Sequence, residues 1–483
     1  MQEIFNIVFH ILFWPCFIYA SYYALMAIVA LIFHRQKYPM VEDESRFCIF
    51  VPCHNEEDVI AATVQNYTNI NYNPELFDIF FLADNCSDKT AERIKEAIES
   101  ANKSNFHLLE RNVSDPNKKG KPHALRWGMD LLEEKDAFYS KYDLFITFDA
   151  DNFVDPDFLK HINSQYLSYK PKKRPVMIQA YLDSKNKDNL IARGYYVAYR
   201  YTNGFFQLAK HKLGLTPGIG GTGFAIALPF LKSIGGYNCR SLVEDVEFET
   251  IATIHGKSIA YNHNVRIYDE KPTSFKAATI QKTRWSQGHW WVFFHYAPKL
   301  ILHMLNPLEI KYFFKRLDNL IHLAALLFML FGAIVTVSPL IALCLGVHTP
   351  INVITIISTF LFYFSIILIP ASSLIDGKKE EKRRVLIDFI PNLLALFINT
   401  VSYYYANVVG LFRCRNQKVW KKTAHKVTSM AAMDEGKKAV EVTEEATLEE
   451  AEVLQEIAVA EETEKLQETE EPHEITAAEN ETE

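Results

Sequence analysis

The sequence predicts an α/β fold in which a doubly wound domain lies between transmembrane helices. Two observations support this prediction. Between residues 46 and 265, short apolar runs of strand length alternate with amphipathic helical patterns. Before and after that region lie apolar runs that are long enough to cross a bilayer. The alternation is typical of buried, parallel strands that are covered by helices on both faces.

The N-terminal residues 4–33 are almost entirely apolar and are followed by the basic residues Arg35 and Lys37. This run is long for a signal peptide, and no small-residue cleavage site follows it. We therefore predict that residues 1–37 form an uncleaved transmembrane anchor, tilted or bent at Pro15. The basic flank places the next residues in the cytosol.

The central segment, residues 46–275, is predicted to be the cytosolic catalytic domain. Its apolar runs predict four strands, at 47–52, 78–83, 143–148 and 176–182. Helical patterns between them predict helices near 57–68, 88–101 and 121–135. Ligands of such sheets bind at the carboxyl ends of the strands, so the polar residues that follow each strand are the candidate site.

Residues 276–303 form a predicted helix rich in Trp, Phe and Tyr, which suits the membrane interface. Two spans, 319–346 and 351–374, then form a predicted transmembrane pair over residues 319–374. The basic loop 377–384, GKKEEKRR, is expected in the cytosol.

Residues 385–411 form a further apolar run, which contains Asp388 and Pro391 near its start. If this run crosses the membrane, the basic segment 413–426 lies outside the cell, against its charge. If the run is interfacial or re-entrant, both basic segments stay inside. We favour the interfacial or re-entrant alternative, because an ionised side chain and a proline are costly in a lipid-exposed span.

The C-terminal residues 431–483 carry 19 acidic and 3 basic side chains. The formal charge of the whole chain is −7, so the preceding residues sum to +9. We expect this acidic tail to be disordered, because it has few apolar side chains to bury. The long apolar runs argue against a wholly soluble protein, and the lack of a basic stripe with interleaved aromatics argues against a nucleic-acid binder.

The seven cysteines form no C-x-x-C pair, and two of them lie in apolar runs. This pattern argues against a zinc site and against a disulfide framework. It fits chemistry that faces the reducing cytosol.

Five polar motifs follow the predicted elements in order: VPCHNEE at 51–57, ADNCSD at 83–88, FDADN at 148–152, VEDVEF at 243–248 and QKTRW at 281–285. Each alone is weak, because an acidic residue after a strand often caps the next helix. Together they resemble the family-2 glycosyltransferases, specifically the processive membrane synthases of cellulose, chitin and hyaluronan. The resemblance covers roughly residues 1–426 and leaves out the acidic tail. It implies a glycosyltransferase A-type doubly wound domain between transmembrane helices, with interfacial amphipathic helices.

Asp149 and Asp151 are spaced so that one short loop presents carboxylates to a hard cation, Mg²⁺ or Mn²⁺. Such a cation would bridge to the diphosphate of a nucleotide-sugar donor. The resemblance implies that Glu56 and Asp84 hold the uridine and that Lys121, in KKGKPHAL at 118–125, lies near the phosphates. An ordinary basic turn that opens a helix is the alternative for Lys121.

The resemblance places Asp245 at the position of the catalytic base, which removes a proton from the acceptor hydroxyl. One carboxylate suffices for direct displacement with inversion, so an α-linked donor gives a β-linked product. Glu244 would orient Asp245. The alternative is that Asp245 only caps a helix at 246–255, and capping is compatible with catalysis.

Gln281 and Arg284 are expected to face the diphosphate, and Trp285 offers a flat surface for the sugar at the growing end. For an Arg-Trp pair on an interfacial helix, anchoring at the membrane surface is the alternative. The loop GIGGTGF at 218–224 resembles the loop beside the acceptor and supplies Gly221, Thr222 and Gly223. Glycines there allow the backbone to approach a sugar closely.

Residues 413–430 are predicted to contain a gating loop, in which Trp420 and Thr423 have the spacing of the aromatic-x-x-Thr element of the family. The alternative is a basic patch that contacts anionic lipid. A gating loop must reach the donor from the cytosol, which is consistent with the interfacial alternative for 385–411.

These features predict a processive, inverting enzyme that polymerises a UDP-sugar, with UDP-glucose as the first choice. The expected product is a cellulose-like or mixed-linkage β-1,3/1,4-glucan that the enzyme helps to move across the plasma membrane. The alternatives are an N-acetylglucosamine or hyaluronan-type polymer, a non-processive transferase that loads a lipid carrier, and an inactive scaffold or transporter. The intact motifs argue against the inactive protein.

The expected partners are the donor, the growing polysaccharide and membrane lipid, and no nucleic acid. Three predicted spans are few for a polymer channel formed by one chain, so we expect a second copy of the chain, an accessory export partner or the interfacial helices to complete the channel. The expected location is the plasma (inner) membrane, as a multi-pass protein with a cytosolic catalytic domain.

Overall fold

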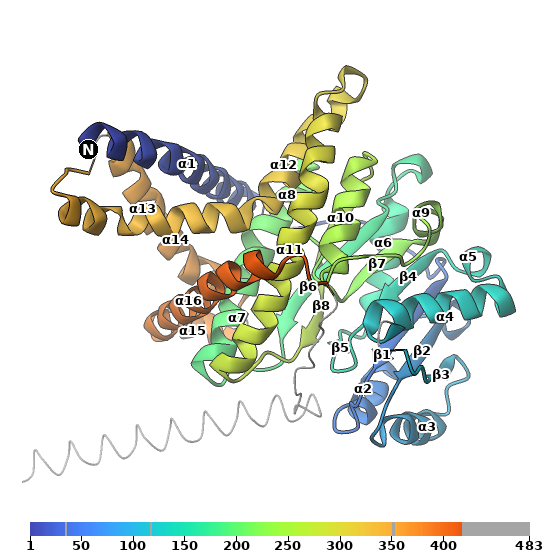
Figure 1. The fold of residues 1–483 in the computed structure, drawn as a ribbon. Coiled ribbons are helices and arrows are strands. Elements are labelled where there is room, and N and C mark those ends of the chain that lie inside the picture. Colours follow the sequence, from blue (N-terminus) through green and yellow to red (C-terminus); the bar gives the residue numbers. More distant parts are fainter. Residues whose placement is uncertain (34–35, 116–117, 350–352, 378, 418–483) are drawn as a thin grey trace, which may run out of the picture. The chain divides into compact units, whose positions relative to one another are not determined.

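A computed structural model describes residues 1–33, 36–115, 118–349, 353–377 and 379–417 (Figure 1). Its centre is an eight-stranded sheet with the order β3-β2-β1-β4-β7-β6-β8-β5. The strands are β1 (Phe47–Cys53), β2 (Phe77–Asp84), β3 (Phe106–Arg111), β4 (Leu144–Thr147), β5 (Phe153–Val154), β6 (Met177–Ser184), β7 (Phe224–Ala227) and β8 (Ile259–Asp269). The prediction of an α/β fold is confirmed.

The four predicted strands correspond to β1, β2, β4 and β6, and β1 pairs in parallel with both β2 and β4. The sheet is mixed, however, because β7 pairs antiparallel with β4 and with β6. The sequence analysis missed β3, β5, β7 and β8. Strand β7 has four residues, and β3 has partly exposed side chains in its middle, so neither produces a long apolar run.

The first half of the domain also contains the three predicted helices, now α2 (Ile60–Tyr67), α3 (Thr90–Ala101) and α4 (Lys121–Asp136). Helix α4 packs against β1 and β2 at Gly128, where an added Cβ would lie 2.8 Å from the ring of Phe50. The Phe50 ring in turn meets Phe80 and Phe145 edge-on. This close approach fixes α4, and therefore its first residue Lys121, over the carboxyl end of the sheet.

The other α-helices of the described residues are α1 (Gln2–Ile32), α5 (Phe138–Lys141), α6 (Phe158–Ser168), α7 (Leu190–Tyr201), α8 (Leu208–Leu213), α9 (Leu228–Ser233), α10 (Glu244–Ile254), α11 (Phe275–Met304), α12 (Phe313–Leu323), α13 (Ala325–Leu345), α14 (Val353–Asp376), α15 (Lys379–Arg383) and α16 (Phe389–Arg413). Helix α16 packs along both α11 and α7, and α1 packs along α13 and α14. Two glycines permit the close contacts of α16 with its neighbours. A Cβ added to Gly194 on α7 would lie 2.5 Å from the carbonyl oxygen of Ala395, and a Cβ added to Gly410 on α16 would lie 2.6 Å from Cβ of Ser286.

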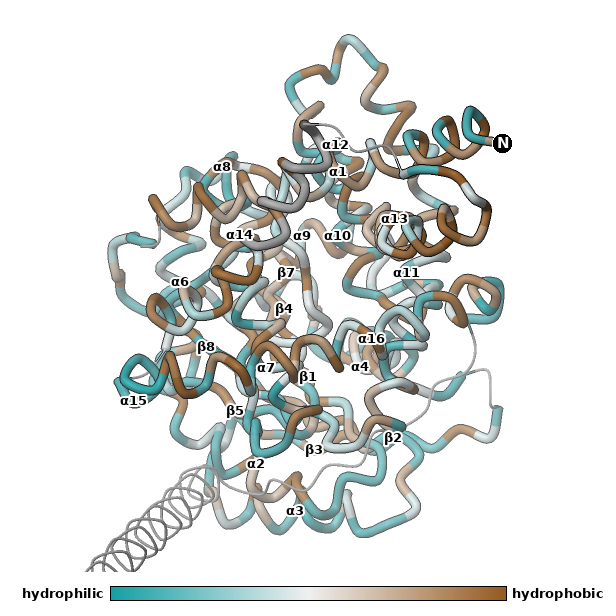
Figure 2. The backbone as a smooth tube through the Cα atoms, turned by 90° about the vertical axis from the view of Figure 1, so that its left-hand side faces the viewer, coloured by the Kyte–Doolittle hydropathy of each residue, from teal (hydrophilic) through white to brown (hydrophobic). Residues whose placement is uncertain are grey.

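Three of the described helices are long and apolar enough to cross a membrane: α1, α13 and α16. Figure 2 shows apolar colouring along α1 and α13. The predicted span 319–346 begins too early, because residues up to Leu323 belong to the separate helix α12, which buries Arg316 and Asp318. The interfacial or re-entrant placement of 385–411 remains a prediction. By length and composition α16 is also compatible with a full span.

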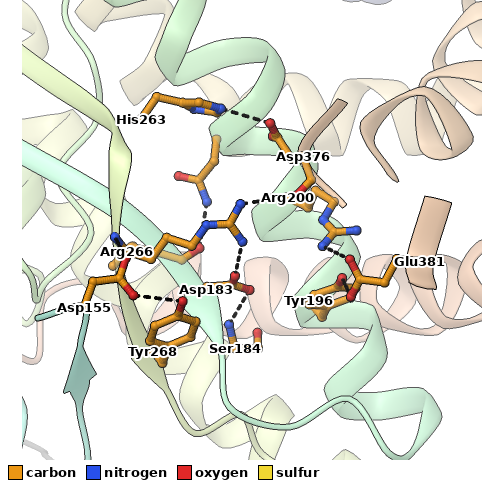
Figure 3. A network of polar contacts seen from close by, with 12 residues as sticks. Asp155, Asp183, Ser184, Tyr196, Arg200, His263, Arg266, Tyr268, Asp376 and Glu381 are labelled. Atoms are coloured by element: carbon orange, nitrogen blue, oxygen red, sulfur yellow. Dashed lines mark hydrogen bonds and ion pairs between the residues drawn. The ribbon is translucent and has the colours of Figure 1, made fainter. Parts of the chain in front are cut away.

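A network of polar contacts joins the end of α14 to the sheet and the helix α15 to α7 (Figure 3). One guanidinium nitrogen of Arg266 on β8 lies 2.6 Å from Oδ2 of Asp183, and the other donates to the carbonyl of Asp376. The carboxylate of Glu381 lies 2.8 Å from the guanidinium of Arg200. The predicted cytosolic loop 377–384 is therefore connected to the α/β domain through Glu381.

Candidate functional site

A cavity of about 1790 Å³ opens at the carboxyl ends of β1, β2 and β4 and continues between α1, α7, α11, α13 and α16. It is lined by all but one of the predicted site residues that the structure describes: Glu56, Asp84, Lys121, Asp149, Asp151, Gly221, Thr222, Glu244, Asp245, Gln281, Arg284 and Trp285. Gly223 does not line it. Instead, Gly223 has a positive φ of 63° and packs on Ile267. Trp420 and Thr423 lie outside the described residues.

The two carboxylates of the D-x-D motif differ in exposure. The side chain of Asp149 is 41% exposed; its Oδ1 contacts Lys121, and its Oδ2 makes no hydrogen bond with a described residue. Asp151 is buried, and its Oδ2 accepts a 3.0 Å hydrogen bond from the backbone N–H of Glu270. No group of three or more His, Cys, Asp and Glu side chains suited to a metal ion occurs among the residues described. Two cavity-facing carboxylates are compatible with a cation that takes its other ligands from a diphosphate and water.

Lys121 contacts three segments of the chain around the cavity. It is the first residue of α4 and follows Gly120, whose φ is 103°. Its Nζ lies 2.7 Å from Oδ1 of Asp149, donates to the carbonyl of Gly221 at 2.8 Å, and lies 3.6 Å from Glu244. Burial alone would lower the pKa of Lys121, but Asp149 and Glu244 outweigh burial and raise it. Lys121 is therefore a fixed positive charge inside the cavity.

Asp84 lies at the end of β2, as predicted, but its carboxylate already has several partners. Oδ1 accepts hydrogen bonds of 2.7 Å from Arg111 and from the side chain of Asn85. Oδ2 accepts from the backbone N–H of Gly120 at 3.3 Å. Asp84 therefore holds the loop that carries Lys121 in place. Arg111 lies on the missed strand β3, so no local pattern indicated this ion pair.

Asp245 lies in the first turn of α10, where the helix begins at Glu244 and has Val243 as its N-cap residue. The alternative that Asp245 is the N-cap residue is wrong in detail, although its Oδ1 accepts from the backbone N–H of Val246 at 2.8 Å. Burial, followed by the adjacent Glu244, raises the pKa of Asp245 to about 7. A carboxylate with a pKa near the working pH is suited to accept a proton from a hydroxyl group.

The QKTRW motif lies on α11, and Gln281, Arg284 and Trp285 share one helical face by their spacing. Oε1 of Gln281 is buried without a hydrogen-bond partner in the described residues. No hydrogen bond or ion pair joins Arg284 to another residue that the structure describes. The ring of Trp285 meets Tyr195 edge-on, with 6.1 Å between the centroids. This face therefore offers an unpaired cation, a free acceptor atom and an aromatic surface to the cavity.

Two buried amides that the sequence analysis did not select hold the loops of the site. Oδ1 of Asn152 accepts from the backbone N–H of Asp149 and from the hydroxyl of Thr222. Nε2 of Gln179 donates to the carbonyl of Thr222, and its Oε1 accepts from the N–H of Gly220. Both amides had a visible signal, because Asn152 ends the FDADN motif and Gln179 is the polar residue within the apolar run of β6.

After α16 the chain returns to the loop that precedes Asp245. Oε1 of Gln417 accepts from the backbone N–H of Leu242 at 2.7 Å, and its Nε2 donates to the carbonyl of Gln287. Gln417 also lines the cavity and is the last residue described. The predicted gating segment 413–430 thus starts at the rim of the cavity. Its remaining residues lie outside the described part of the chain.

Several proteins with known activities are similar in sequence to this chain. Glucomannan 4-β-mannosyltransferase 7 from Arabidopsis thaliana is 26% identical over 252 residues, which is 52% of this chain and 43% of that protein. A β-monoglucosyldiacylglycerol synthase from Trichormus variabilis is 25% identical over 240 residues, which is 50% of this chain and 48% of that protein. The matched region therefore spans about half the length of these relatives.

The fold also resembles that of a solved structure. The mannosyltransferase PcManGT from Pyrobaculum calidifontis, solved in complex with GDP-Man and Mn²⁺, superposes with a TM-score of 0.52 at 15% identity. The match covers 82% of this chain and 98% of that protein. At this identity the likeness supports the fold alone.

The α/β domain also matches a known sequence family. Residues 45–288 match the family described as "Glycosyltransferase like family 2". This region contains the D-x-D motif, Asp245 and the QKTRW motif, and it makes up half of the chain. The resemblance that the motifs indicated is confirmed at the level of the family: the chain belongs to glycosyltransferase family 2.

Proposed function

We propose that this enzyme is an inverting, processive synthase that extends a β-linked polysaccharide from a nucleotide-sugar donor at a membrane. The observation that carries the proposal is that one cavity contains Asp245, Asp149 and Trp285 and continues between the helices α1, α13 and α16. A donor and the end of a long acceptor can therefore occupy the same space. A transferase that releases its product after each step does not need this extension.

The donor diphosphate requires positive charge as it leaves. Lys121 and Arg284 supply two cations in the cavity, and Gln281 adds an amide. Asp149 and Asp151 would hold Mg²⁺ or Mn²⁺, which supplies further charge neutralisation to the diphosphate. Glu56 and Asp84 border the part of the cavity nearest β1 and β2, where we place the nucleoside.

Asp245 is the proposed general base. It accepts the proton of the acceptor hydroxyl, the hydroxyl oxygen forms the new bond to the anomeric carbon, and the nucleoside diphosphate leaves with the bonding electrons. A single displacement inverts the anomeric centre. Glu244 and Lys121 keep the charge around Asp245 fixed, while Trp285 orients the acceptor sugar.

UDP-glucose remains the first choice of donor, with a cellulose-like or mixed-linkage β-glucan as product. The glucomannan mannosyltransferase relatives make a β-1,4-linked mannose-containing polymer the next choice. We place the catalytic domain in the cytosol of a plasma-membrane protein, where it meets nucleotide sugars. Either a second copy of the chain or an accessory partner would complete the export path.

Transfer of a single sugar to a lipid is the second candidate. It is favoured by the β-monoglucosyldiacylglycerol synthases among the relatives. The cavity also reaches α1 and α13, which carry many exposed apolar side chains, so a lipid acceptor could enter beside them. Both candidates share the same donor chemistry and the same base.

Incubation of purified enzyme in lipid nanodiscs with labelled UDP-glucose, or separately with GDP-mannose, distinguishes the candidates. The proposal expects a polymer that resists extraction with organic solvent and is degraded by a linkage-specific β-glucanase or β-mannanase. A solvent-soluble glycolipid as the only product would replace polymerisation by lipid glycosylation. Asp245→Asn serves as the inactive control.

A further inference from the structure

Beyond Trp285, the cavity is lined by two histidines that the proposed chemistry does not use, His289 and His322. His289 lies four residues after Trp285 on α11, so it occupies the same face about 6 Å further along the helix. Its Nε2 lies 3.2 Å and 3.1 Å from the carbonyl oxygens of His322 and Leu323. The two imidazole rings meet edge-on, with 5.4 Å between their centroids.

Helix α10 also brings a side chain next to His322. Glu249 lies one turn after Asp245, again about 6 Å further along its helix. Oε2 of Glu249 lies 4.0 Å from Nε2 of His322, and Oε1 accepts a 2.7 Å hydrogen bond from Asn319. His289 lies one turn beyond Trp285 on α11, and Glu249 lies one turn beyond Asp245 on α10. Both residues lie next to His322. The step is comparable to the length of one hexosyl unit.

The donor and acceptor atoms of His289 can be assigned from its contacts. Because Nε2 of His289 faces two carbonyl oxygens, it carries the proton, and Nδ1 is the acceptor. Nδ1 has no hydrogen-bond partner in the described residues. The imidazole of His322 is partly exposed to the cavity, and the aliphatic side chains of Leu326 and Met329 line the cavity nearby. Polar edges beside apolar surfaces match the hydroxyl edges and C–H faces of a pyranose ring.

The charges around this place cancel. Lys210 also lines the cavity, but its ammonium lies 3.2 Å from the buried carboxylate of Asp318. Burial raises the pKa of Glu249 to about 8, so it is largely protonated at neutral pH. Burial also lowers the pKa of His289 and that of His322. Among the described residues at this place, Lys210 is therefore already paired and is not available to neutralise a carboxylate on an acceptor sugar, and the unpaired Arg284 lies beside Trp285 instead.

We infer that His289 and His322 form a second acceptor subsite, which binds an uncharged hexosyl unit next to the unit stacked on Trp285. The inference rests on the proposed function, because it requires a saccharide acceptor. It narrows the product class to polymers of neutral hexoses. A polymer with alternating uronate units would bury a carboxylate at a place where the described cation, Lys210, is already paired with Asp318.

The test compares acceptors that reach the subsite with acceptors that do not. Methyl β-glucoside fills only the position at Trp285, whereas cellobiose fills both positions; methyl β-mannoside and β-1,4-mannobiose form the second pair. For the full-length enzyme, KM for each acceptor and KM for the donor are measured. The variants are H289Q and H322Q, and the control is H295Q, an exposed histidine on the same helix.

We expect H289Q and H322Q each to raise KM for the disaccharides about fivefold, as for one lost hydrogen bond. KM for the monosaccharides and for the donor should stay unchanged, and H295Q should behave as wild type. Wild type should also use 4-O-β-glucosyl-glucuronic acid at least tenfold less efficiently than cellobiose. The inference is overturned by equal changes for mono- and disaccharides, by unchanged disaccharide KM values, or by efficient use of the uronate.

A different result identifies failure of the proposed function itself. If wild type transfers sugar to lipid but to no saccharide, polymer synthesis and the subsite both fail. If wild type extends saccharides and the variants do not discriminate between them, only the subsite fails. A large drop in the melting temperature of H289Q would mark a structural role. H322Q then decides, because the backbone carbonyl of His322, which accepts from His289, is retained in that variant.

Discussion

The ammonium group of Lys121 lies 2.7 Å from the carboxylate of Asp149, in the D-x-D motif, and 3.6 Å from that of Glu244, beside the base. One lysine therefore contacts both the proposed metal-binding loop and the residue next to the proposed base. An arriving diphosphate brings negative charge to the same place, so Lys121 can exchange a carboxylate partner for a phosphate partner without crossing the cavity. Lys121 is therefore well placed to bind the donor.

Replacement of Lys121 by methionine should lower kcat/KM for the donor by about 10²-fold or more, because it removes a buried cation from two carboxylates and from the diphosphate. Lys121→Arg should keep part of the activity. Steady-state kinetics and titration with the nucleoside diphosphate provide the measurements. Lys118→Met, an exposed lysine three residues earlier, is the control. Wild-type kinetics in Lys121→Met would remove this residue from donor binding.

Asp245→Asn should reduce kcat by at least about 10²-fold and leave donor binding intact, because the amide keeps the size of the side chain but accepts no proton. In the wild type, the raised pKa of about 7 means that Asp245 is protonated and inactive below that pH. Activity should therefore rise with pH and reach half its limit near pH 7. Activity that is flat between pH 5 and 8 would contradict the role of base. Asp58→Asn, at an exposed site, is the control.

Chelation with EDTA should abolish transfer, and addition of Mg²⁺ or Mn²⁺ should restore it. The two carboxylates and the leaving diphosphate are all negatively charged, so a cation between them is needed. Asp151→Ala should weaken donor binding more than Asp151→Glu, which keeps a carboxylate. Calorimetric titration of the donor with and without metal tests the binding directly. Full activity in excess chelator would rule out a metal role for the D-x-D motif.

Gly410→Leu should destabilise the protein by about 1–3 kcal/mol, because the new side chain would push α16 away from α11. Its Cβ would lie 2.6 Å from Cβ of Ser286 and 2.8 Å from the backbone nitrogen of Gln287. Thermal unfolding in detergent measures the effect. Gly332→Leu is the matched control, since nothing lies within 4 Å of a Cβ there. Equal melting temperatures for the two variants would show that the α11–α16 contact is unimportant for stability.

Cysteines introduced at positions 416 and 436 should react with a membrane-impermeant maleimide only from the cytosolic side. This follows from the interfacial or re-entrant placement of 385–411, which keeps both basic flanks inside. Cys344, at the far end of α13, is exposed and should react from the outside, so it is an internal positive control. Labelling of position 416 in intact cells would establish α16 as a full span and end the gating-loop hypothesis.

Features encoded by continuous residues were predictable from the sequence. Strands β1 and β2 were visible because their side chains are nearly all buried and therefore apolar. Asp149, Asp245 and Trp285 were visible because each belongs to a short motif. Asp149 was expected in the cavity from the rule that ligands bind at strand ends, whereas Asp245 and Trp285 were expected there from the family resemblance; all three line the cavity.

Features that depend on distant contacts were not predictable. The pairing of Asp84 with Arg111 depends on where β3 lies beside β2, and β3 has no clear apolar pattern. The place of His322 depends on a break between α12 and α13 after Leu323, inside a run that looked like one continuous span. In both cases the deciding contact joins segments whose order in space the sequence does not contain.

The contacts of Arg266 and Arg200 with Asp376 and Glu381 bear on whether the catalytic domain is an autonomous folding unit. A fragment ending at residue 275 would retain both arginines and lose both carboxylate-bearing residues. The guanidinium of Arg200 is almost fully buried, so the fragment would leave an uncompensated charge in its interior. The boundary at 275 therefore separates the α/β sequence pattern from the apolar helices that follow, but the two parts do not fold as separate units. Exchanging the membrane helices of this chain for those of a relative would require an acidic residue at 381, whereas at 376 Arg266 needs only the backbone carbonyl.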